Sequence, residues 1–336
     1  MKRILFYFNG VYSGGTEVEA VTLMKMLKGK YELYFTYYDT EGSFKNTIKK
    51  MNELAIYIPF DSNTTVDTII FCTNATDHIK EIDNNFKHEK AYYWFHYYSG
   101  RQNEFARIAL EGECNNIITV SEASNKKLSD FDFSKGKEEK IITINNIVDI
   151  QKIKDGGKEN VDVDLNHTLN LVTIARIAPE KRFDRIIKIA QKLEEKNIDY
   201  QWIIIGKVNL QTCTDYERNI QDEFKKHPSI ILIGETDNPY KYLAKADYSL
   251  LLSDRETWGL VITESKILEV PCVVTNFDAS KEQIEDGKNG IVLDIKNEDY
   301  DTLVKRMLED KKQLKDNIKG FEYDNESILE KWYKLL

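Results

Sequence analysis

The stretch "SDRETWGLVITESKILEVPCVVT", residues 253–275, sets Glu256 and Glu264 eight positions apart, across a glycine and ahead of an apolar run. It continues the run "YSLLLS", residues 248–253, which predicts a buried strand. "DRETWG" is then a polar turn, and "LVITESKILE" predicts a helix. A strand, a turn and a helix in this order are one unit of an α/β sheet.

The start of that expected helix is suited to binding a phosphate. Backbone N–H groups near Gly259, Leu260 and Val261 lack partners within the helix and carry the positive end of its dipole. Glu264 would lie inside the helix and Glu256 in the loop before it, so the two carboxylates can contact different parts of one ligand. The alternative is that both are ordinary solvated glutamates.

Two cations follow another predicted strand earlier in the chain. In "ARIAPEKRFDRII", residues 175–187, Arg176 and Lys181 come after the apolar segment 169–175 and just before an amphipathic helix. At the carboxyl end of a strand they can neutralise a diphosphate, Arg176 through bidentate hydrogen bonds and Lys181 as a point charge. The alternative is that they are surface cations beside a turn.

Short apolar runs alternate with amphipathic stretches throughout the 336 residues, which predicts parallel strands joined by helices. The irregular, polar segment 149–167 reads as an interdomain linker. We therefore expect an α/β protein with two Rossmann-like, doubly wound domains facing a cleft. The predicted domains are residues 1–155 and 165–320, and residues 321–336 are expected to form a helix that packs back on the first domain.

Bulk composition places the chain among globular proteins and excludes several classes. Hydrophobic residues make up 41% of it, and the formal net charge of -9 argues against nucleic-acid binding. No run is long enough to span a membrane, and the amino-terminal apolar run is too short for a signal peptide. A disulfide framework or zinc site is not indicated, because the cysteines are scattered singly at Cys72, Cys114, Cys213 and Cys272. A reducing cytoplasm fits this pattern best.

A strand followed by "ARIAPEK", and "ETWGLVITE" ahead of "SKILEVPCVV", together resemble the retaining glycosyltransferases of family 4, which have the GT-B fold. The likeness runs over most of residues 170–295. It implies that Glu256 contacts the sugar of a nucleotide-sugar donor and Glu264 its ribose. It assigns the donor diphosphate to Arg176 and Lys181. The remaining donor-side positions that the motif implies are Thr257, Trp258, Gly259 and Leu260.

The chain departs from this family pattern at two positions. The family often has glycine directly after the first glutamate, where this chain has Thr257, and a Gly-x-Gly after the strand "WIIIG", where it continues "GKVN". Both departures concern contacts to the donor rather than the fold.

The amino-terminal half contributes a glycine pair and a histidine. Gly14 and Gly15 follow the first predicted strand and precede a helix, so a phosphate or an acceptor could approach the backbone closely; an ordinary turn is the alternative. His96 follows the aromatic run "AYYWF". A lone histidine in aromatic surroundings is usually a packed residue, but the resemblance implies a histidine beside the donor sugar, and we therefore include His96 among the expected catalytic residues with Glu256, Arg176 and Lys181.

The resemblance implies a retaining glycosyltransferase that moves a sugar from a nucleotide diphosphate, with UDP favoured, to a hydroxyl of a saccharide or lipid-linked acceptor. No cofactor or essential metal is expected, because protein cations would compensate the diphosphate; "VDVD", residues 161–164, is expected to be a solvated acidic stretch. The chain is expected in the cytoplasm, with peripheral contact at the inner membrane face.

Three other functions share features with this one. A glycoside hydrolase is disfavoured because eight residues of continuous helix separate two carboxylates by about 12 Å, more than such a pair needs. A nucleotide-sugar epimerase of the same architecture and a GT-B subunit without catalytic activity stay open, although the joint presence of Arg176, Lys181, Glu256 and Glu264 favours an active transferase.

Overall fold

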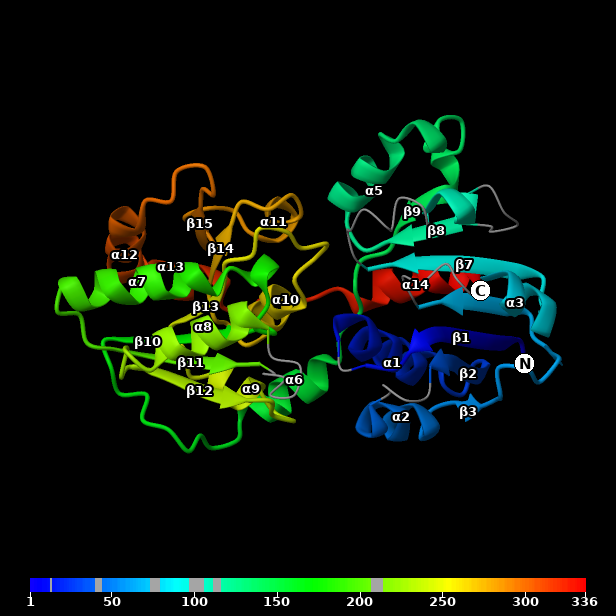
Figure 1. The fold of residues 1–336 in the computed structure, drawn as a ribbon, viewed down its shortest axis with the longest axis horizontal. Coiled ribbons are helices and arrows are strands. Elements are labelled where there is room, and N and C mark those ends of the chain that lie inside the picture. The colour runs from blue at the N-terminus through cyan, green and yellow to red at the C-terminus, as the bar shows by residue number, and fades with distance from the viewer. Residues whose placement is uncertain (13, 40–43, 73–78, 97–105, 111–115, 207–213) are drawn as a thin grey trace. The chain divides into compact units, whose positions relative to one another are not determined.

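The chain folds into two compact units, shown as ribbons in Figure 1. The computed structural model describes residues 1–12, 14–39, 44–72, 79–96, 106–110, 116–206 and 214–336. Met1–Val148 and Asp324–Leu336 form the first unit, and Asp149–Tyr323 form the second. The first unit is therefore built from two separate segments of the chain.

The first unit contains a seven-stranded sheet in the order β3-β2-β1-β5-β7-β8-β9, and all of its neighbouring strands are parallel. Strand order reverses beside β1, where β5 lies on the side opposite to β2. The strands of this sheet are β1 (Arg3–Gly10), β2 (Glu32–Asp39), β3 (Ile56–Tyr57), β5 (Thr68–Phe71), β7 (Lys90–Phe95), β8 (Asn116–Thr119) and β9 (Ile141–Thr143). A separate parallel pair is β4 (Thr64–Thr65) with β6 (Phe86–Lys87).

Except for α14, which follows the second unit in sequence, the helices of the first unit lie between successive strands, as parallel pairing requires. They are α1 (Gly15–Leu27), α2 (Lys45–Asn52), α3 (Ile79–Asn85), α5 (Glu122–Ser129) and α14 (Asn325–Leu335), with short 3₁₀ turns η1 (Asp132–Ser134) and η2 (Glu138–Lys140). The core is apolar on both sides of β1, because Leu5, Phe6, Tyr7 and Phe8 are all buried. Such a continuous buried run is typical of a parallel strand covered on two faces.

The second unit has a six-stranded parallel sheet in the order β12-β11-β10-β13-β14-β15. Counted from its own first strand this order is 3-2-1-4-5-6, the doubly wound arrangement. Its strands are β10 (Leu169–Ile174), β11 (Tyr200–Ile205), β12 (Ile230–Gly234), β13 (Tyr248–Leu251), β14 (Cys272–Thr275) and β15 (Gly290–Leu293). The predicted α/β class and doubly wound topology are thus present in this unit.

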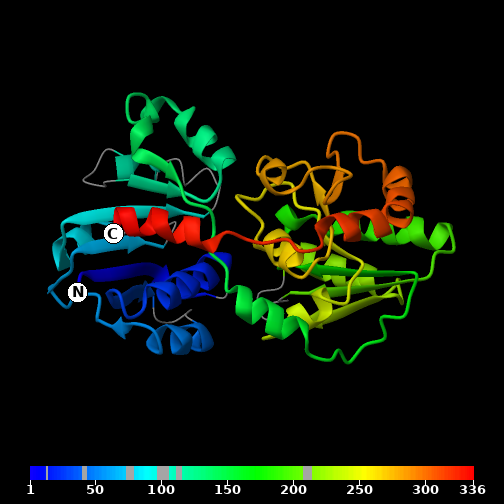
Figure 2. The same ribbon diagram turned by 180° about the vertical axis from the view of Figure 1, so that it is seen from behind.

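Helices cover both faces of the second sheet, which Figure 2 shows from behind. Side chains alternate along β11: Trp202 and Ile204 join the core of one face, and Ile203 and Ile205 that of the other. The first core also contains residues of α7, α8, α12 and α13, and the second contains residues of α9. The helices of this unit are α6 (Ile150–Gly157), α7 (Phe183–Glu195), α8 (Asp215–Phe224), α9 (Tyr240–Leu243), α10 (Leu260–Ile267), α11 (Ser280–Gln283), α12 (Tyr300–Glu309) and α13 (Lys311–Ile318), with the 3₁₀ turn η3 (Pro179–Lys181).

The prediction of an irregular linker over residues 149–167 is wrong for the first half of that segment. Residues Ile150–Gly157 form α6, whose start is capped by the Asp149 side chain. A side chain at Gly157 would lie 2.7 Å from Leu268 Cδ2, so glycine there allows α6 to pack closely on the segment that ends α10. The division between units falls at Val148, seven residues before the expected end of the first domain.

Helix α14 belongs to the first unit, although it follows the whole of the second unit in sequence. Trp332 is fully buried and packs edge-on against Trp94 of β7, with ring centroids 4.9 Å apart. The Lys90 ammonium group and the Tyr92 hydroxyl both donate to the carbonyl oxygen of Leu335, at 2.7 and 2.8 Å. These contacts hold α14 against the sheet strand that precedes His96.

Candidate nucleotide-sugar site

The predicted charged residues gather at the switch point of the second sheet. Strand order reverses between β10 and β13, which are neighbours. In open α/β sheets, ligands bind beyond the carboxyl ends of the strands at this point. Arg176 and Lys181 follow the carboxyl end of β10, and Glu256 follows that of β13.

Lys181 and Glu256 form an ion pair across this point. The Lys181 ammonium group donates to Glu256 Oε1 at 2.5 Å, and both side chains are largely buried. The Ser253 hydroxyl donates to the same oxygen at 2.7 Å. The two loops are also tied through their backbones, since the N–H of Asp254 donates to the carbonyl of Glu180 at 3.0 Å. A cation and a carboxylate are thus held together where a charged ligand would bind.

Arg176 lies at the same edge of the sheet but is much more exposed. Its guanidinium is 3.4 Å from Glu180 Oε1, and 66% of its side chain is accessible. A charge-assisted contact at this distance and exposure is weak. Arg176 can therefore turn toward a phosphate without giving up a strong internal partner.

Gly259 shapes the loop between Glu256 and α10. Its φ of 84° is in the left-handed region, and a side chain there would lie 2.9 Å from Leu251 Cδ2. Glycine adopts a positive φ readily and has no side chain that would collide with Leu251. Because it has no side chain, the first turn of α10, which begins at Leu260, carries no side-chain cap at its start. The predicted helix thus begins directly after Gly259, and phosphate binding at its start stays a prediction.

Trp258 supports this loop through its side chain. It is buried, and its indole N–H donates to the Thr263 hydroxyl at 3.0 Å, which in turn donates to Gln283 Oε1 at 2.8 Å. The Gln283 amide closes the ring by donating to the carbonyl of Trp258 at 2.6 Å. The indole therefore fixes the loop from within, and a ligand contact by Trp258 would have to come from its backbone. Thr257 precedes it on the same loop, in a half-buried position.

Glu264 lies within α10 and has a partner different from that of Glu256. The Tyr240 hydroxyl donates to Glu264 Oε1 at 3.0 Å. Burial raises the pKa of Glu264, while the Tyr240 hydrogen bond and the nearby charge of Lys152 act in the opposite direction. Since Glu256 precedes the helix, the separation of about 12 Å that was used against a hydrolase does not apply. The two carboxylates have different partners, and their separate roles toward a ligand stay a prediction.

A buried arginine beneath the site escaped prediction. Arg185 of α7 is fully buried; it donates to the Leu252 carbonyl at 2.7 Å and pairs with Asp254 and Glu298, each at 2.8 Å. Burial alone would raise the pKa of Glu298, but hydrogen bonds from Tyr300, Arg185 and Lys188 outweigh it and bring the pKa to about 2. This network holds the loop after β13. Its signal in the sequence was an arginine within the apolar stripe of a predicted helix.

The glycine pair of the first unit lies where the strand-to-helix turn was expected. Gly14 precedes α1, and Gly15 is its first residue. However, the N–H groups of Tyr12 and Gly14 donate to the two carboxylate oxygens of Glu17, at 3.2 and 3.1 Å. A phosphate would meet that carboxylate, so this turn is disfavoured as a phosphate site. The role of Gly14 and Gly15 beside an acceptor stays a prediction.

His96 follows β7, and 6% of its side chain is exposed. Its Nδ1 lies 3.4 Å from Oε2 of Glu19 in α1, and its ring packs on Trp94 with centroids 4.5 Å apart. Burial lowers the pKa of His96 to about 3 and raises that of Glu19 well above its ordinary value. His96 is therefore neutral near pH 7. These surroundings match the packed histidine that was the alternative, and its catalytic role stays a prediction.

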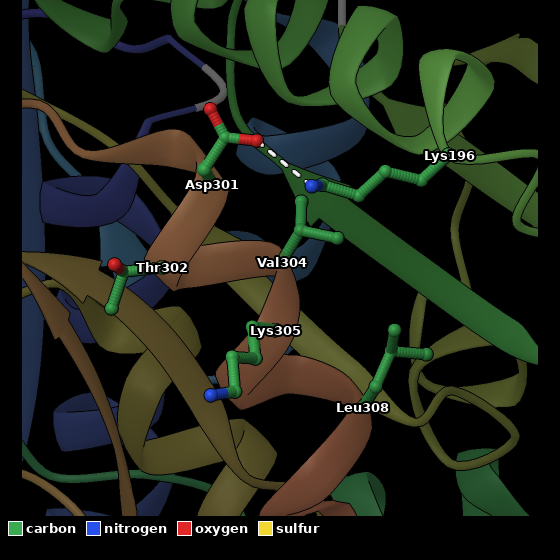
Figure 3. Close-up of a pocket in the computed structure, with 6 residues that line it drawn as sticks. All are labelled: Lys196, Asp301, Thr302, Val304, Lys305 and Leu308. Atoms are coloured by element: carbon green, nitrogen blue, oxygen red, sulfur yellow. Dashed lines mark ion pairs between the residues drawn. The ribbon is translucent and has the colours of Figure 1, made fainter.

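Figure 3 shows a hollow in the second unit. It is lined by Lys196, Asp301, Thr302, Val304, Lys305 and Leu308, and an ion pair of 2.9 Å joins Lys196 to Asp301. Lys196 follows the carboxyl end of α7, whereas the candidate site adjoins the start of that helix. The hollow contains none of the predicted site residues.

The described residues contain neither a cluster of metal ligands nor a helix that could span a membrane. In this part of the chain, no group of three or more histidine, cysteine, aspartate or glutamate side chains could hold a metal ion. No helix among the same residues combines the length and apolar character needed to cross a bilayer. Cys72 and Cys272 are buried free thiols, while Cys114, Cys213 and the residues of "GKVN" after Gly206 lie outside the described ranges.

Comparison with solved structures identifies the fold. The crystal structure of Anabaena HepE in complex with UDP and glucose superposes with a TM-score of 0.81 at 15% identity, over 99% of each chain. The crystal structure of TarM superposes with a TM-score of 0.73 at 15% identity, over 100% of this chain and 98% of the other. The chain thus has the two-unit GT-B fold, as predicted. Residues 164–321, nearly all of the second unit, match the family "Glycosyl transferases group 1", and this unit belongs to that family.

Curated relatives agree with this family. Poly(ribitol-phosphate) alpha-N-acetylglucosaminyltransferase of Staphylococcus aureus is 25% identical over 80% of this chain and 55% of its own length. A Campylobacter jejuni enzyme, N-acetylgalactosamine-N,N'-diacetylbacillosaminyl-diphospho-undecaprenol 4-alpha-N-acetylgalactosaminyltransferase, is 23% identical over 94% of this chain and 92% of its own. Against three of the curated relatives, the chain spans only 32%, 55% and 48% of their length.

Proposed function

We propose that this protein is a retaining glycosyltransferase that moves a sugar from a UDP-sugar to a hydroxyl of a saccharide or lipid-linked acceptor, in the synthesis of a surface polysaccharide or glycoconjugate. The observation that carries the proposal is the Lys181–Glu256 pair at the switch point between β10 and β13. It joins a cation for a diphosphate to a carboxylate for sugar hydroxyls at the place where such sheets bind ligands.

In this proposal the second unit holds the donor. Lys181, Arg176 and the start of α10 receive the diphosphate, and they stabilise the negative charge that grows on it as the sugar leaves. Glu256 contacts the transferred sugar, and Glu264 accepts hydrogen bonds from the ribose. The carboxylate of Glu256 is oriented by Lys181 and Ser253, which supports its role as a fixed acceptor.

The donor nucleotide and the stereochemistry rest on likeness to relatives. A solved structure of similar fold is described as a complex with UDP-glucose, and another as a complex with UDP. The resemblance to family 4 favours retention, by substitution on the same face with the leaving phosphate accepting the acceptor's proton. No essential metal is proposed, since side chains and helix amides supply the compensating charge.

A panel of nucleotide-sugars tests the function directly. Purified protein is incubated with UDP-, GDP- and ADP-sugars and candidate saccharide acceptors, and nucleotide release and thermal stabilisation are measured. Transfer with retention of the anomeric configuration is expected for a UDP-sugar. Epimer formation without transfer would instead identify an epimerase, and binding without turnover a subunit that has no catalytic activity.

The cellular location of the protein is the last part of this proposal. We place the protein in the cytoplasm with peripheral contact at the inner membrane face. The first unit supports such a contact, because Tyr38, Ile56 and Tyr57 are exposed and α2 carries the exposed lysines Lys49 and Lys50. Sedimentation with anionic vesicles tests the contact, and the absence of binding at low salt would rule it out.

A further inference from the structure

Tyr240 is buried and directed at Glu264. It is the first residue of α9, it is 7% exposed, and its hydroxyl donates to Glu264 Oε1 at 3.0 Å. Burial and the neighbouring charge of Glu264 raise the pKa of Tyr240, so this hydroxyl stays protonated and acts as a donor. The bond joins α9 to α10, and β13 lies between these two helices in the sequence.

The backbone of Tyr240 is fixed from a second direction by α6. Its N–H donates to Asn238 Oδ1 at 3.1 Å, and the Asn238 amide donates to the carbonyl of Gly156 at 3.0 Å. A side chain at Gly156 would lie 2.7 Å from Asn238 Oδ1 and 3.0 Å from the Tyr240 ring. Glycine at this position therefore lets α6 approach closely enough to hold both residues.

We propose that Tyr240 is a positioning residue that orients the Glu264 carboxylate toward the ribose hydroxyls of the donor. This inference rests on the proposed function and adds to it the means by which the ribose is recognised. A carboxylate has about four lone-pair positions on two oxygens. Tyr240 occupies one of them on Oε1, which fixes the plane of the group and leaves Oε2 for the ligand. Without this bond, the carboxylate of a long side chain would have to be ordered when the ligand binds.

A second tyrosine of the same helix provides a matched control. The Tyr242 hydroxyl donates to Asp162 Oδ1 at 2.8 Å, in a segment where 73% of the aspartate side chain is exposed. Tyr242 is itself buried. Tyr240→Phe and Tyr242→Phe therefore remove the same kind of bond from the same helix, but only the first removes a partner of Glu264.

The experiment measures nucleotide binding by calorimetry with UDP, GDP and ADP and with their 2′,3′-dideoxy analogues. For the nucleotide that the wild-type protein binds, Tyr240→Phe should lower affinity on the order of 10-fold. Affinity for the dideoxy analogue should stay unchanged, because the hydroxyls that Glu264 accepts are missing. Tyr242→Phe should leave both affinities at the wild-type level. In a Glu264→Gln background, Tyr240→Phe should produce a much smaller further loss.

The outcomes separate this inference from the proposed function. If the wild-type protein binds a nucleoside diphosphate and Tyr240→Phe binds it equally well, the inference is wrong and the function stands. Equal losses for the nucleotide and its dideoxy analogue would assign Tyr240 a merely structural role and also overturn it. If the wild-type protein binds none of the three nucleotides, the proposed function fails first, and the inference fails with it.

Discussion

Lys181 and Glu256 form an ion pair, so the replacement of either residue changes the other's surroundings. We predict that Lys181→Ala weakens nucleoside diphosphate binding by about 1.5–3 kcal/mol, the usual cost of losing a charge-assisted contact. Arg176→Ala should act in the same direction. Calorimetry tests both variants, with Lys188→Ala as a control cation of the same unit. Unchanged affinity in both variants would remove the two residues from the site.

The two glutamates of the opening motif should differ in what they affect. Glu264→Gln is expected to weaken donor and bare nucleotide alike, since the ribose changes little during the reaction. Glu256→Gln should lower turnover more than nucleotide affinity, because its sugar partner is absent from the bare nucleotide. Steady-state kinetics with the donor and calorimetry with the nucleotide give the comparison. The opposite pattern would exchange their roles, and no effect in either would make them ordinary surface glutamates.

Site residues that directly follow a strand could be predicted from the sequence. Residues whose role depends on contacts made only in the folded chain could not. Lys181 and Glu256 could be anticipated together because strand order alone brings their loops to one edge. The capture of two backbone amides by Glu17 could not, since it depends on the shape of one turn. Nor did Tyr240 stand out, because its partner is on a helix that is not adjacent in sequence.

Among elements, α7 supports the loop after β13 from below. Its Arg185 is the buried cation that holds the loop after β13 through Asp254 and the Leu252 carbonyl. Arg185→Ala removes the buried cation from Asp254 and Glu298, which keep only the more exposed Arg182 and Lys188. We predict a loss of about 3 kcal/mol in the free energy of unfolding of the second unit, as is usual when one partner of a buried pair is removed.

Lys188, one turn further along α7, supplies the control for that prediction. It contacts the same Glu298 at 3.2 Å, but 47% of its side chain is exposed. Lys188→Ala should therefore cost less than about 1 kcal/mol. Chemical denaturation followed by circular dichroism measures both variants. If the two lost equal stability, Arg185 would not be the support inferred for this loop.

The prediction of elements failed most clearly at α6. Its sequence "IQKIKDGG" ends in two glycines, which normally argue against a helix. Both are explained by packing: side chains at Gly156 and Gly157 would collide with Asn238 and Leu268. Tertiary contacts that no local pattern contains therefore decided the structure of this segment.

For the whole molecule, the doubly wound topology of both sheets could be predicted, because continuous apolar runs separated by helices admit few other arrangements. The charge that would compensate a diphosphate is concentrated in the second of these units. We predict that transferase activity persists in EDTA, since side chains and helix amides replace a metal ion. Activity assays with and without the chelator check this. Complete loss that magnesium or manganese restores would contradict it.

The division of the first unit into two chain segments has a consequence for biosynthesis. Residues 1–148 emerge from the ribosome long before Asp324–Leu336 are synthesised, and the second unit is synthesised in between. Until α14 arrives, Trp94 lacks the tryptophan that packs against it, and Lys90 and Tyr92 lack their carbonyl acceptor. The unit that is translated first is therefore completed last, and a nascent chain stalled before Asp324 would present an unfinished amino-terminal sheet to chaperones.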